Sequence, residues 1–136
     1  MNPPAFTNLD HVTILITDWA RSVAFYRDTL GLPEVAIPST FPGAGVPVRW
    51  FRVGGQFIHL YKSDTADPPS PRHFALHVGD MQAARVHFAE KGVPVSETVR
   101  IPGADRFFIF DPDGNRIEII HWENQGEIRP VQARAK

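Results

Sequence analysis

The sequence predicts an α+β protein in which two βαβββ repeats form a curved mixed sheet with helices on its outer face. Three observations predict it: two strand-helix-strand segments match position by position, two further strand segments follow each of them, and polar residues recur at matched places on these strands. We expect the 136 residues to form a single domain, with repeats over residues 8–64 and 72–123 and a tail over residues 124–136.

Each repeat opens with a strand that carries a histidine and leads into a helix. The matching segments read LDHVTILITDWARSVAFYRDTLGLPEV and RHFALHVGDMQAARVHFAEKGVPV. His11 stands seven residues before Asp18, and His73 stands seven residues before Asp80. Because a short acidic side chain can accept hydrogen bonds from the first free amides of a helix, each aspartate is a candidate N-cap.

Both predicted helices have one apolar face and end at a glycine. The helical period gives an apolar face of Trp19, Val23, Tyr26 and Leu30 in the first repeat and of Met81, Ala84 and Phe88 in the second. Gly31 follows Asp18 by thirteen residues, and Gly92 follows Asp80 by twelve. Both glycines stand where a left-handed C-terminal cap is expected.

Each repeat then continues with two more strands joined by a turn. The strand segments are VRWFRV and QFIHLYK in the first repeat, and RFFIFD and NRIEIIHW in the second. Gly55 precedes His59 by four residues, as Gly114 precedes Glu118. The second turn reads DPDG but lacks the later acidic ligands of an EF-hand, so we expect a tight turn.

The alternation of side chains along the strands places four polar residues on one face of the sheet. We call this the donor face; it carries His11, His59, His73 and Glu118, together with Thr13, Leu15, Phe57, Tyr61, Ala75, His77, Arg116 and Ile120. The opposite parity is wholly apolar, with Val12, Ile14, Ile16, Ile58, Leu60, Phe74, Leu76, Val78, Ile117 and Ile119. We expect the helices to bury the apolar face and the donor face to border a cavity.

Three imidazoles and one carboxylate on this face form a candidate metal site. Nitrogen and oxygen donors suit one divalent ion such as Zn, Ni, Co, Mn or Fe, and the chain has no cysteine for a thiolate site. Three neutral histidines and one glutamate leave such a site about one unit positive, which favours an anionic or enediolate-forming substrate. His11 alone could be an ordinary hydrogen-bonded histidine of a strand, but its matched position in both repeats favours metal ligation. For His59 the alternative is that it lines the pocket without binding the metal.

Five residues on the donor face are candidates for substrate binding: Thr13, Phe57, Tyr61, His77 and Arg116. His77 lies two strand steps from His73, which favours pocket lining or support of a ligand over direct ligation. Arg116 has the alternative of pairing with a neighbouring side chain. The Pro- and Gly-rich stretch at residues 38–47 is expected to form a loop over the cavity mouth, and the tail a mobile end or an arm on a neighbouring subunit.

Composition excludes several classes of protein. The formal net charge is -1, so the chain offers no positive surplus for nucleic acid. No apolar stretch approaches the ~20 residues that span a bilayer, and the first ten residues do not resemble a secretory signal. We therefore expect a cytoplasmic protein without a membrane or nucleic-acid partner.

The chain resembles a known family, the vicinal oxygen chelate superfamily, which includes glyoxalase I, fosfomycin-resistance enzymes, extradiol dioxygenases and bleomycin-resistance proteins. The resemblance covers residues 8 to 123 and rests on LDHVTILITD, SVAFYRDTLGL, QFIHLY, RHFALHV and FFIFDPDGNRIEII. It implies metal ligation by His11, by His73 rather than His77, and by Glu118. His59 stands where glyoxalase I has a glutamate, so strict glyoxalase I activity is not implied. Dimers are common in this superfamily, which implies a homodimer.

Several functions are compatible with this resemblance. The first is a metal-dependent lyase or isomerase that acts by proton transfer on a small substrate with vicinal oxygens, with Glu118 or a metal-bound hydroxide as the base. The second is a non-haem iron dioxygenase of the extradiol type. The third is a metal-free, drug-binding resistance protein, against which the four intact donors argue. Thr13, two residues after His11, also matches the fosfomycin-type thiol transferases, but their remaining phosphonate-binding residues have no match.

Overall fold

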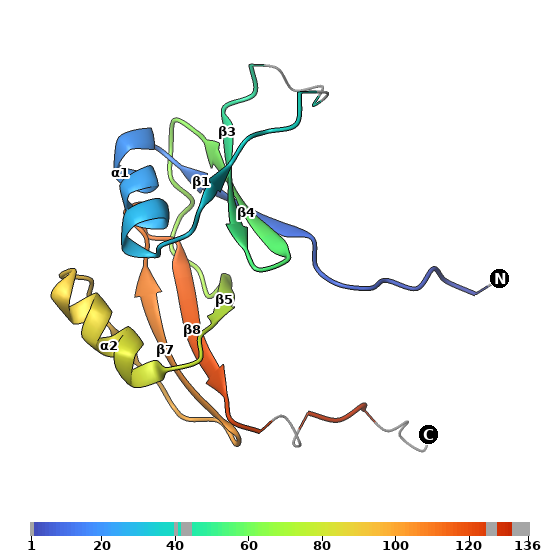
Figure 1. The fold of residues 1–136 in the computed structure, drawn as a ribbon, viewed down its shortest axis with the longest axis vertical. Coiled ribbons are helices and arrows are strands. Elements are labelled where there is room, and N and C mark those ends of the chain that lie inside the picture. Colours follow the sequence, from blue (N-terminus) through green and yellow to red (C-terminus); the bar gives the residue numbers. More distant parts are fainter. Residues whose placement is uncertain (1, 40, 42–44, 125–127, 132–136) are drawn as a thin grey trace. The chain divides into compact units, whose positions relative to one another are not determined.

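The computed structural model describes residues 2–39, 41, 45–124 and 128–131, and its elements follow the predicted order (Figure 1). The first repeat contains β1 (His11–Ile16), α1 (Trp19–Val23), η1 (Ala24–Thr29), β2 (Glu34–Val35), β3 (Val48–Val53) and β4 (Gln56–Lys62). The second contains β5 (His73–His77), α2 (Met81–Glu90), β6 (Ser96–Glu97), β7 (Ala104–Phe110) and β8 (Arg116–Trp122). The predicted α+β fold with two βαβββ repeats is confirmed. Parts of the predicted loop (residues 40 and 42–44) and of the predicted tail (residues 125–127 and 132–136) lie outside the described residues.

Each repeat forms its own four-stranded mixed sheet. The strand orders are β1-β4-β3-β2 and β5-β8-β7-β6. In both sheets the first strand of the repeat is parallel to the last strand, and the other pairs are antiparallel. The chain divides into two compact units, unit 1 over residues 1–70 and 111–115 and unit 2 over residues 71–110 and 116–136.

The predicted helix caps are present in both repeats. A side-chain oxygen of Asp18 accepts a hydrogen bond from the Arg21 amide at 2.9 Å, and Asp80 accepts one from the Ala83 amide at the same distance. Gly31 and Gly92 have φ angles of 72° and 70°, in the left-handed region that glycine adopts without steric cost. Matched capping residues therefore fix the start and end of each helical segment.

The first helix departs from the regular α-helix that its sequence predicts. After α1 the chain widens into η1, a π-helix, in which the Leu30 amide donates to the Phe25 carbonyl at 2.8 Å. The wider turn brings Phe25 into the interior next to Tyr26, at exposures of 7% and 0%. Phe25 was absent from the predicted apolar face because a period of 3.6 residues places it to one side.

The helices cover the apolar face of each sheet, as the strand parity predicts. The Tyr26 ring of η1 contacts Phe51 of β3, with ring centroids 6.1 Å apart. In unit 2, Phe88 of α2 meets Phe107 of β7 edge to face at 6.0 Å, and α2 runs beside β7 (Figure 1). Burial of each large apolar side chain contributes roughly 1.5–3 kcal/mol to folding.

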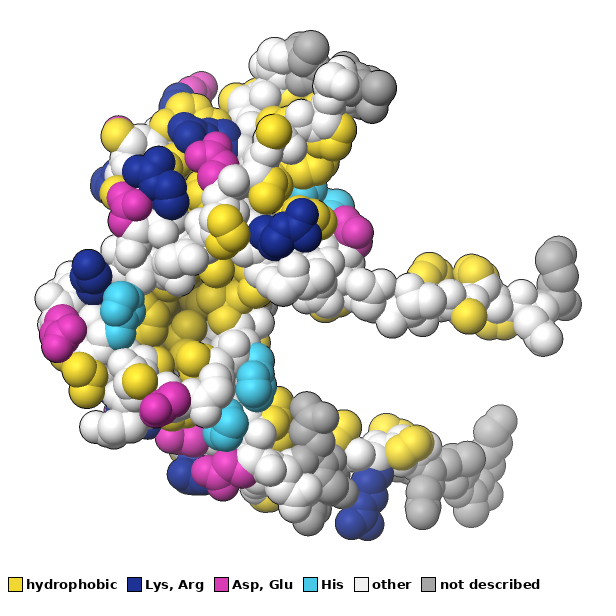
Figure 2. All heavy atoms as spheres, viewed as in Figure 1, with side chains coloured by type: hydrophobic (Ala, Val, Ile, Leu, Met, Phe, Trp, Pro, Cys, Tyr) yellow, Lys and Arg dark blue, Asp and Glu magenta, His cyan; other side chains and the backbone are white. Residues whose placement is uncertain are grey.

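Charged side chains of both signs lie on the surface of the molecule (Figure 2), and several in unit 1 form pairs. Arg27 pairs with Asp28 at 2.9 Å, and Arg49 forms two hydrogen bonds to Glu34 at 2.6 and 2.7 Å. Pairs exposed to this degree contribute little to stability, so the apolar face remains the main source of folding energy. No helix in the described part of the chain has the length and apolarity needed to cross a membrane.

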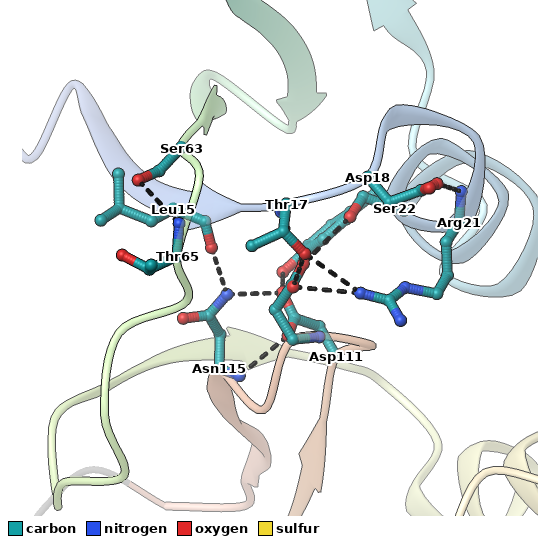
Figure 3. Close-up of polar contacts among 11 residues, drawn as sticks. Leu15, Thr17, Asp18, Arg21, Ser22, Ser63, Thr65, Asp111 and Asn115 are labelled. Atoms are coloured by element: carbon teal, nitrogen blue, oxygen red, sulfur yellow. Dashed lines mark hydrogen bonds and ion pairs between the residues drawn. The ribbon is translucent and has the colours of Figure 1, made fainter.

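The DPDG turn between β7 and β8 belongs to compact unit 1 and forms the tight turn that its sequence predicts. The carboxylate of Asp111 accepts hydrogen bonds from the Tyr26 hydroxyl, from the Asn115 side-chain amide and from the backbone amides of Asp113 and Asn115, at 2.8–2.9 Å. Figure 3 shows Asn115 also donating to the Leu15 carbonyl, at 2.8 Å. Burial raises the pKa of Asp111, and these hydrogen bonds oppose that rise.

Candidate functional site

Unit 1 brings two of the predicted donors together on one face of its sheet. His11 lies on β1 and His59 on β4, and the register pairs Thr13 with His59. The two imidazole rings are stacked, with centroids 4.0 Å apart and planes inclined by 16°. The strand parity therefore predicted their common face correctly.

Trp50 extends this pair into a stack of three rings. It lies on β3 directly opposite His59, and its ring is parallel to the imidazole within 2° at 4.2 Å. His59 is 8% exposed, and its Nε2 and the Trp50 Nε1 are buried without a hydrogen-bond partner among the described residues. Trp50 was not among the predicted site residues, although the register of the β3–β4 hairpin places it opposite His59.

The position in the stack alters the acid–base behaviour of His59. Burial lowers its pKa, the charge of His11 lowers it further, and the carboxylate of Asp10 acts in the opposite direction. The neutral imidazole is thereby favoured, and this is the form that binds a metal.

We expect the stability of the metal-free protein to fall on acidification, in part through His59. Because the folded pKa is lowered, unfolded His59 takes up a proton first as the pH drops below about 6.5, and the unfolded state gains. Urea denaturation between neutral pH and about pH 5 should show a smaller loss of unfolding free energy for His59→Gln than for wild type. Equal losses in His59→Gln and wild type would contradict the assignment.

A carboxylate orients the His11 ring. The distance between His11 Nδ1 and Asp10 Oδ2 is 2.8 Å, and the Asp10 side chain is 81% exposed. A carboxylate bound at Nδ1 favours the tautomer with a proton on that nitrogen, which leaves the Nε2 lone pair available.

Unit 2 repeats this arrangement with the other two predicted donors. The His73 Nδ1 lies 2.9 Å from the Pro71 carbonyl oxygen, which again leaves Nε2 available. That Nε2 is 3.9 Å from Oε1 of Glu118, whose position in β8 is paired with Ala75 of β5. Each unit thus contains one pair of the predicted donors, on its first and last strands.

Arg106, which was not among the predicted site residues, contacts Glu118 of this pair. Its Nη1 donates to Oε1 of Glu118 at 2.8 Å, and its Nε donates to the Val99 carbonyl at 3.2 Å. The β7–β8 register pairs Arg106 with Ile120, so strand parity could have placed it on the donor face. Arg116 lies with its guanidinium carbon 3.7 Å from the centroid of the Phe108 ring.

His77 has a local role in the structure. Its Nε2 accepts a hydrogen bond from the Trp122 amide at 3.1 Å, which occupies the lone pair that a metal would need. The nearby His121, of opposite parity, has its Nδ1 2.8 Å from the Val78 carbonyl. Both contacts tie β5 to β8, the strands that carry His73 and Glu118.

A pocket of about 550 Å³ opens on the donor face of unit 1. The predicted residues Thr13, Phe57 and Tyr61 line it with both histidines, and Phe41 and Val46 reach it from the predicted loop over residues 38–47. The full lining is Asp10, His11, Thr13, Phe41, Val46, Val48, Trp50, Phe57, His59 and Tyr61. This size suits a small ligand.

The chemistry of the donors fits a divalent metal. His11 and His73 each have Nδ1 next to an oxygen acceptor, the usual arrangement of a histidine that binds a metal through Nε2. His59 supplies a neutral imidazole with an unpartnered nitrogen, and Glu118 a carboxylate. In the described ranges, no group of three or more His, Asp or Glu side chains is close enough to hold an ion.

Comparisons with known proteins agree with the repeated fold. The family model described as Glyoxalase/Bleomycin resistance protein/Dioxygenase superfamily matches residues 8–119. The chain is 27% identical to Glyoxylase I 4 of Arabidopsis thaliana over 90% of this chain and 75% of that protein. It is 32% identical to YaeR of Escherichia coli strain K12, described as uncharacterized, over 80% of this chain and 92% of that protein.

Solved structures show the same fold. A Bacillus anthracis protein described as belonging to the glyoxalase family superposes with a TM-score of 0.80 and 26% identity, over 89% of this chain and 99% of that chain. A lactoylglutathione lyase from Agrobacterium tumefaciens has a TM-score of 0.69 and 23% identity, over 92% and 99% of the respective chains. Because the family model spans most of the chain and the repeat topology agrees with it, the protein belongs to the Glyoxalase/Bleomycin resistance protein/Dioxygenase superfamily.

Proposed function

We propose that the protein is a metal-dependent, glyoxalase-like lyase or isomerase that moves a proton on a small substrate with two vicinal oxygens. One observation carries the proposal: in each repeat the first-strand histidine is anchored through Nδ1, and a second donor from the last strand lies beside it. A drug-binding protein without a metal has no need of this repeated arrangement.

The proposed ligands are His11, His73 and Glu118, with His59 as the fourth. His59 has to leave its stack to bind, because its Nε2 is covered and parallel rings do not direct their nitrogens at one point. The donor set suits Zn, Ni, Co, Mn or Fe. When bound, such an ion polarises the substrate carbonyl and stabilises negative charge on the vicinal oxygens.

Glu118 is the proposed base of the reaction. Its carboxylate can take a proton from the carbon next to the substrate carbonyl and return it to the neighbouring carbon. Arg106 holds Oε1 of this carboxylate at 2.8 Å and fixes its direction. Thr13, Phe57 and Tyr61 are proposed to contact the substrate in the pocket, Arg116 to attract an acidic group, and His77 to support the strand that carries His73.

Metal content tests the proposed ligands. We expect the purified protein to hold close to one divalent ion per chain by elemental analysis, and His73→Ala and Glu118→Ala to lose most of it, because a site with one ligand fewer binds far more weakly. His59→Ala should lose less of the metal, since the His59 ring has to leave its stack before it can bind the ion. His87→Gln on α2 serves as the control and should keep the metal. Unchanged content in the His73 and Glu118 variants would refute the proposed site.

The reaction itself separates a lyase or isomerase from a dioxygenase. We expect the metal-loaded protein to exchange the protons next to the carbonyl of 2-hydroxyacetophenone for deuterium in heavy water, followed by NMR. Oxygen consumption with catechol and iron(II) in place of this exchange would instead assign the dioxygenase alternative. We also propose a homodimer, as the superfamily implies, which light scattering would detect as twice the chain's 15.2 kDa.

A further inference from the structure

The lining of the pocket in unit 1 indicates the kind of group that it binds. Besides the two histidines it has four aromatic side chains and two valines: Phe41, Trp50, Phe57, Tyr61, Val46 and Val48. Asp10 is the one carboxylate in this lining, and its side chain is 81% exposed. No lysine or arginine belongs to the lining as described, and the guanidinium carbon of Arg52 lies 4.9 Å from the Phe57 ring centroid. An anionic group inside this lining would lose its hydration without a direct counter-ion.

The aromatic side chains form an ordered cluster of stacked and edge-to-face rings. Trp50 and His59 are parallel within 2°, and the His11 ring continues the stack at 16°. Phe41 meets the Trp50 ring edge to face, at 5.7 Å and 81°. The positive ring edges that such a cluster presents match the negative face of another aromatic ring, which prefers offset-stacked or edge-to-face contacts.

We propose that this pocket binds an uncharged, flat aromatic ring, the part of the substrate that does not chelate the metal. The proposal deepens the proposed function and rests on it, because the same pocket is lined by His11 and His59. It excludes a charge on the ring that enters this pocket. It also makes Trp50 and Phe57 the residues that determine specificity.

Three probes test the chemical class directly, with the protein freed of metal by a chelator. They are 2-hydroxyacetophenone, the same ketone with a cyclohexyl ring, and the same ketone with a carboxylate on its aromatic ring. The saturated ring is at least as apolar, so hydrophobic transfer alone would favour it. Stacking should make the phenyl ketone bind roughly three- to tenfold more tightly than the cyclohexyl ketone, and the carboxylated ketone should bind most weakly.

Binding can be measured by NMR at the site itself. The three tryptophans give three indole N–H signals, and the one that Trp50→Leu removes is assigned to Trp50. That signal should shift on titration with the phenyl ketone. Phe57→Leu keeps this reporter and should reduce the preference for phenyl over cyclohexyl to less than about twofold. Phe110→Leu, in an aromatic residue outside the pocket lining, should leave the preference unchanged.

Four outcomes would overturn the proposal. They are equal affinity for the phenyl and cyclohexyl ketones, tighter binding of the carboxylated ketone, a preference unaltered in both Trp50→Leu and Phe57→Leu, and no binding of any probe. All measurements are made without metal. Failure of the proposed function would therefore appear in the metal content and deuterium exchange, separately from this result.

Discussion

Replacement of Glu118 by glutamine is expected to slow deuterium exchange into 2-hydroxyacetophenone by about 10²- to 10⁴-fold, which is the usual contribution of a general base. Glutamine retains the shape of the side chain but cannot accept the proton. NMR in heavy water measures the rate, with metal supplied in excess so that weaker ligation alone does not produce the loss.

A conservative variant and a surface control accompany this measurement. Glu118→Asp keeps a carboxylate at a shorter reach and should retain more activity than Glu118→Gln. Glu90→Gln changes an exposed glutamate at the end of α2 and should exchange at the wild-type rate. A Glu118→Gln rate within a few-fold of wild type would assign the proton transfer to another group.

Replacement of Asp111 by alanine is expected to destabilise the fold by about 3 kcal/mol or more, because buried donors then lose their acceptor. The Tyr26 hydroxyl and the backbone amides of Asp113 and Asn115 all donate to this carboxylate. In a chain of this size such a loss lowers the melting temperature by roughly 10 °C, which calorimetry can measure.

The matched control is Asp67→Ala, in an exposed aspartate of the same unit. A surface substitution of this kind should change the unfolding free energy by less than about 0.5 kcal/mol. Equal melting temperatures for Asp111→Ala and Asp67→Ala would show that the hydrogen bonds to Asp111 make no net contribution to the stability of the fold. The raised pKa of Asp111 would then reflect burial without compensating contacts.

The repeat and the strand parity predicted the fold because both depend on local patterns. Alternation along β1, β4, β5 and β8 is a property of the sequence itself, and so are the caps at Asp18 and Asp80. The π-helix was not predicted, since the hydrogen bond from Leu30 to Phe25 depends on how the turn packs rather than on residue type. For Asp111 the sequence predicted only a place in a tight turn. Its hydrogen bond with Tyr26 was not predicted, because it joins residues far apart in the chain.

The sequence predicted which residues are the donors of the candidate site, but not the side chains that contact them. Parity placed His11 and His59 on one face, but the distance and angle of their stack depend on strand register and rotamers. Arg106 was not predicted because its partner is twelve residues away on the next strand. Only the registered pairing of β7 with β8 brings it to Glu118.

The π-helix explains how two repeats of unequal length keep equivalent strands. From capping aspartate to terminal glycine, the first repeat has one residue more than the second. A regular helix would rotate Gly31 by a fraction of a turn and misdirect the chain that follows. The widened turn between Ala24 and Thr29 absorbs the additional residue, and Gly31 still adopts φ 72°. The additional residue is thereby accommodated within the helical segment, and β1 and β4 form the same parallel pairing as β5 and β8.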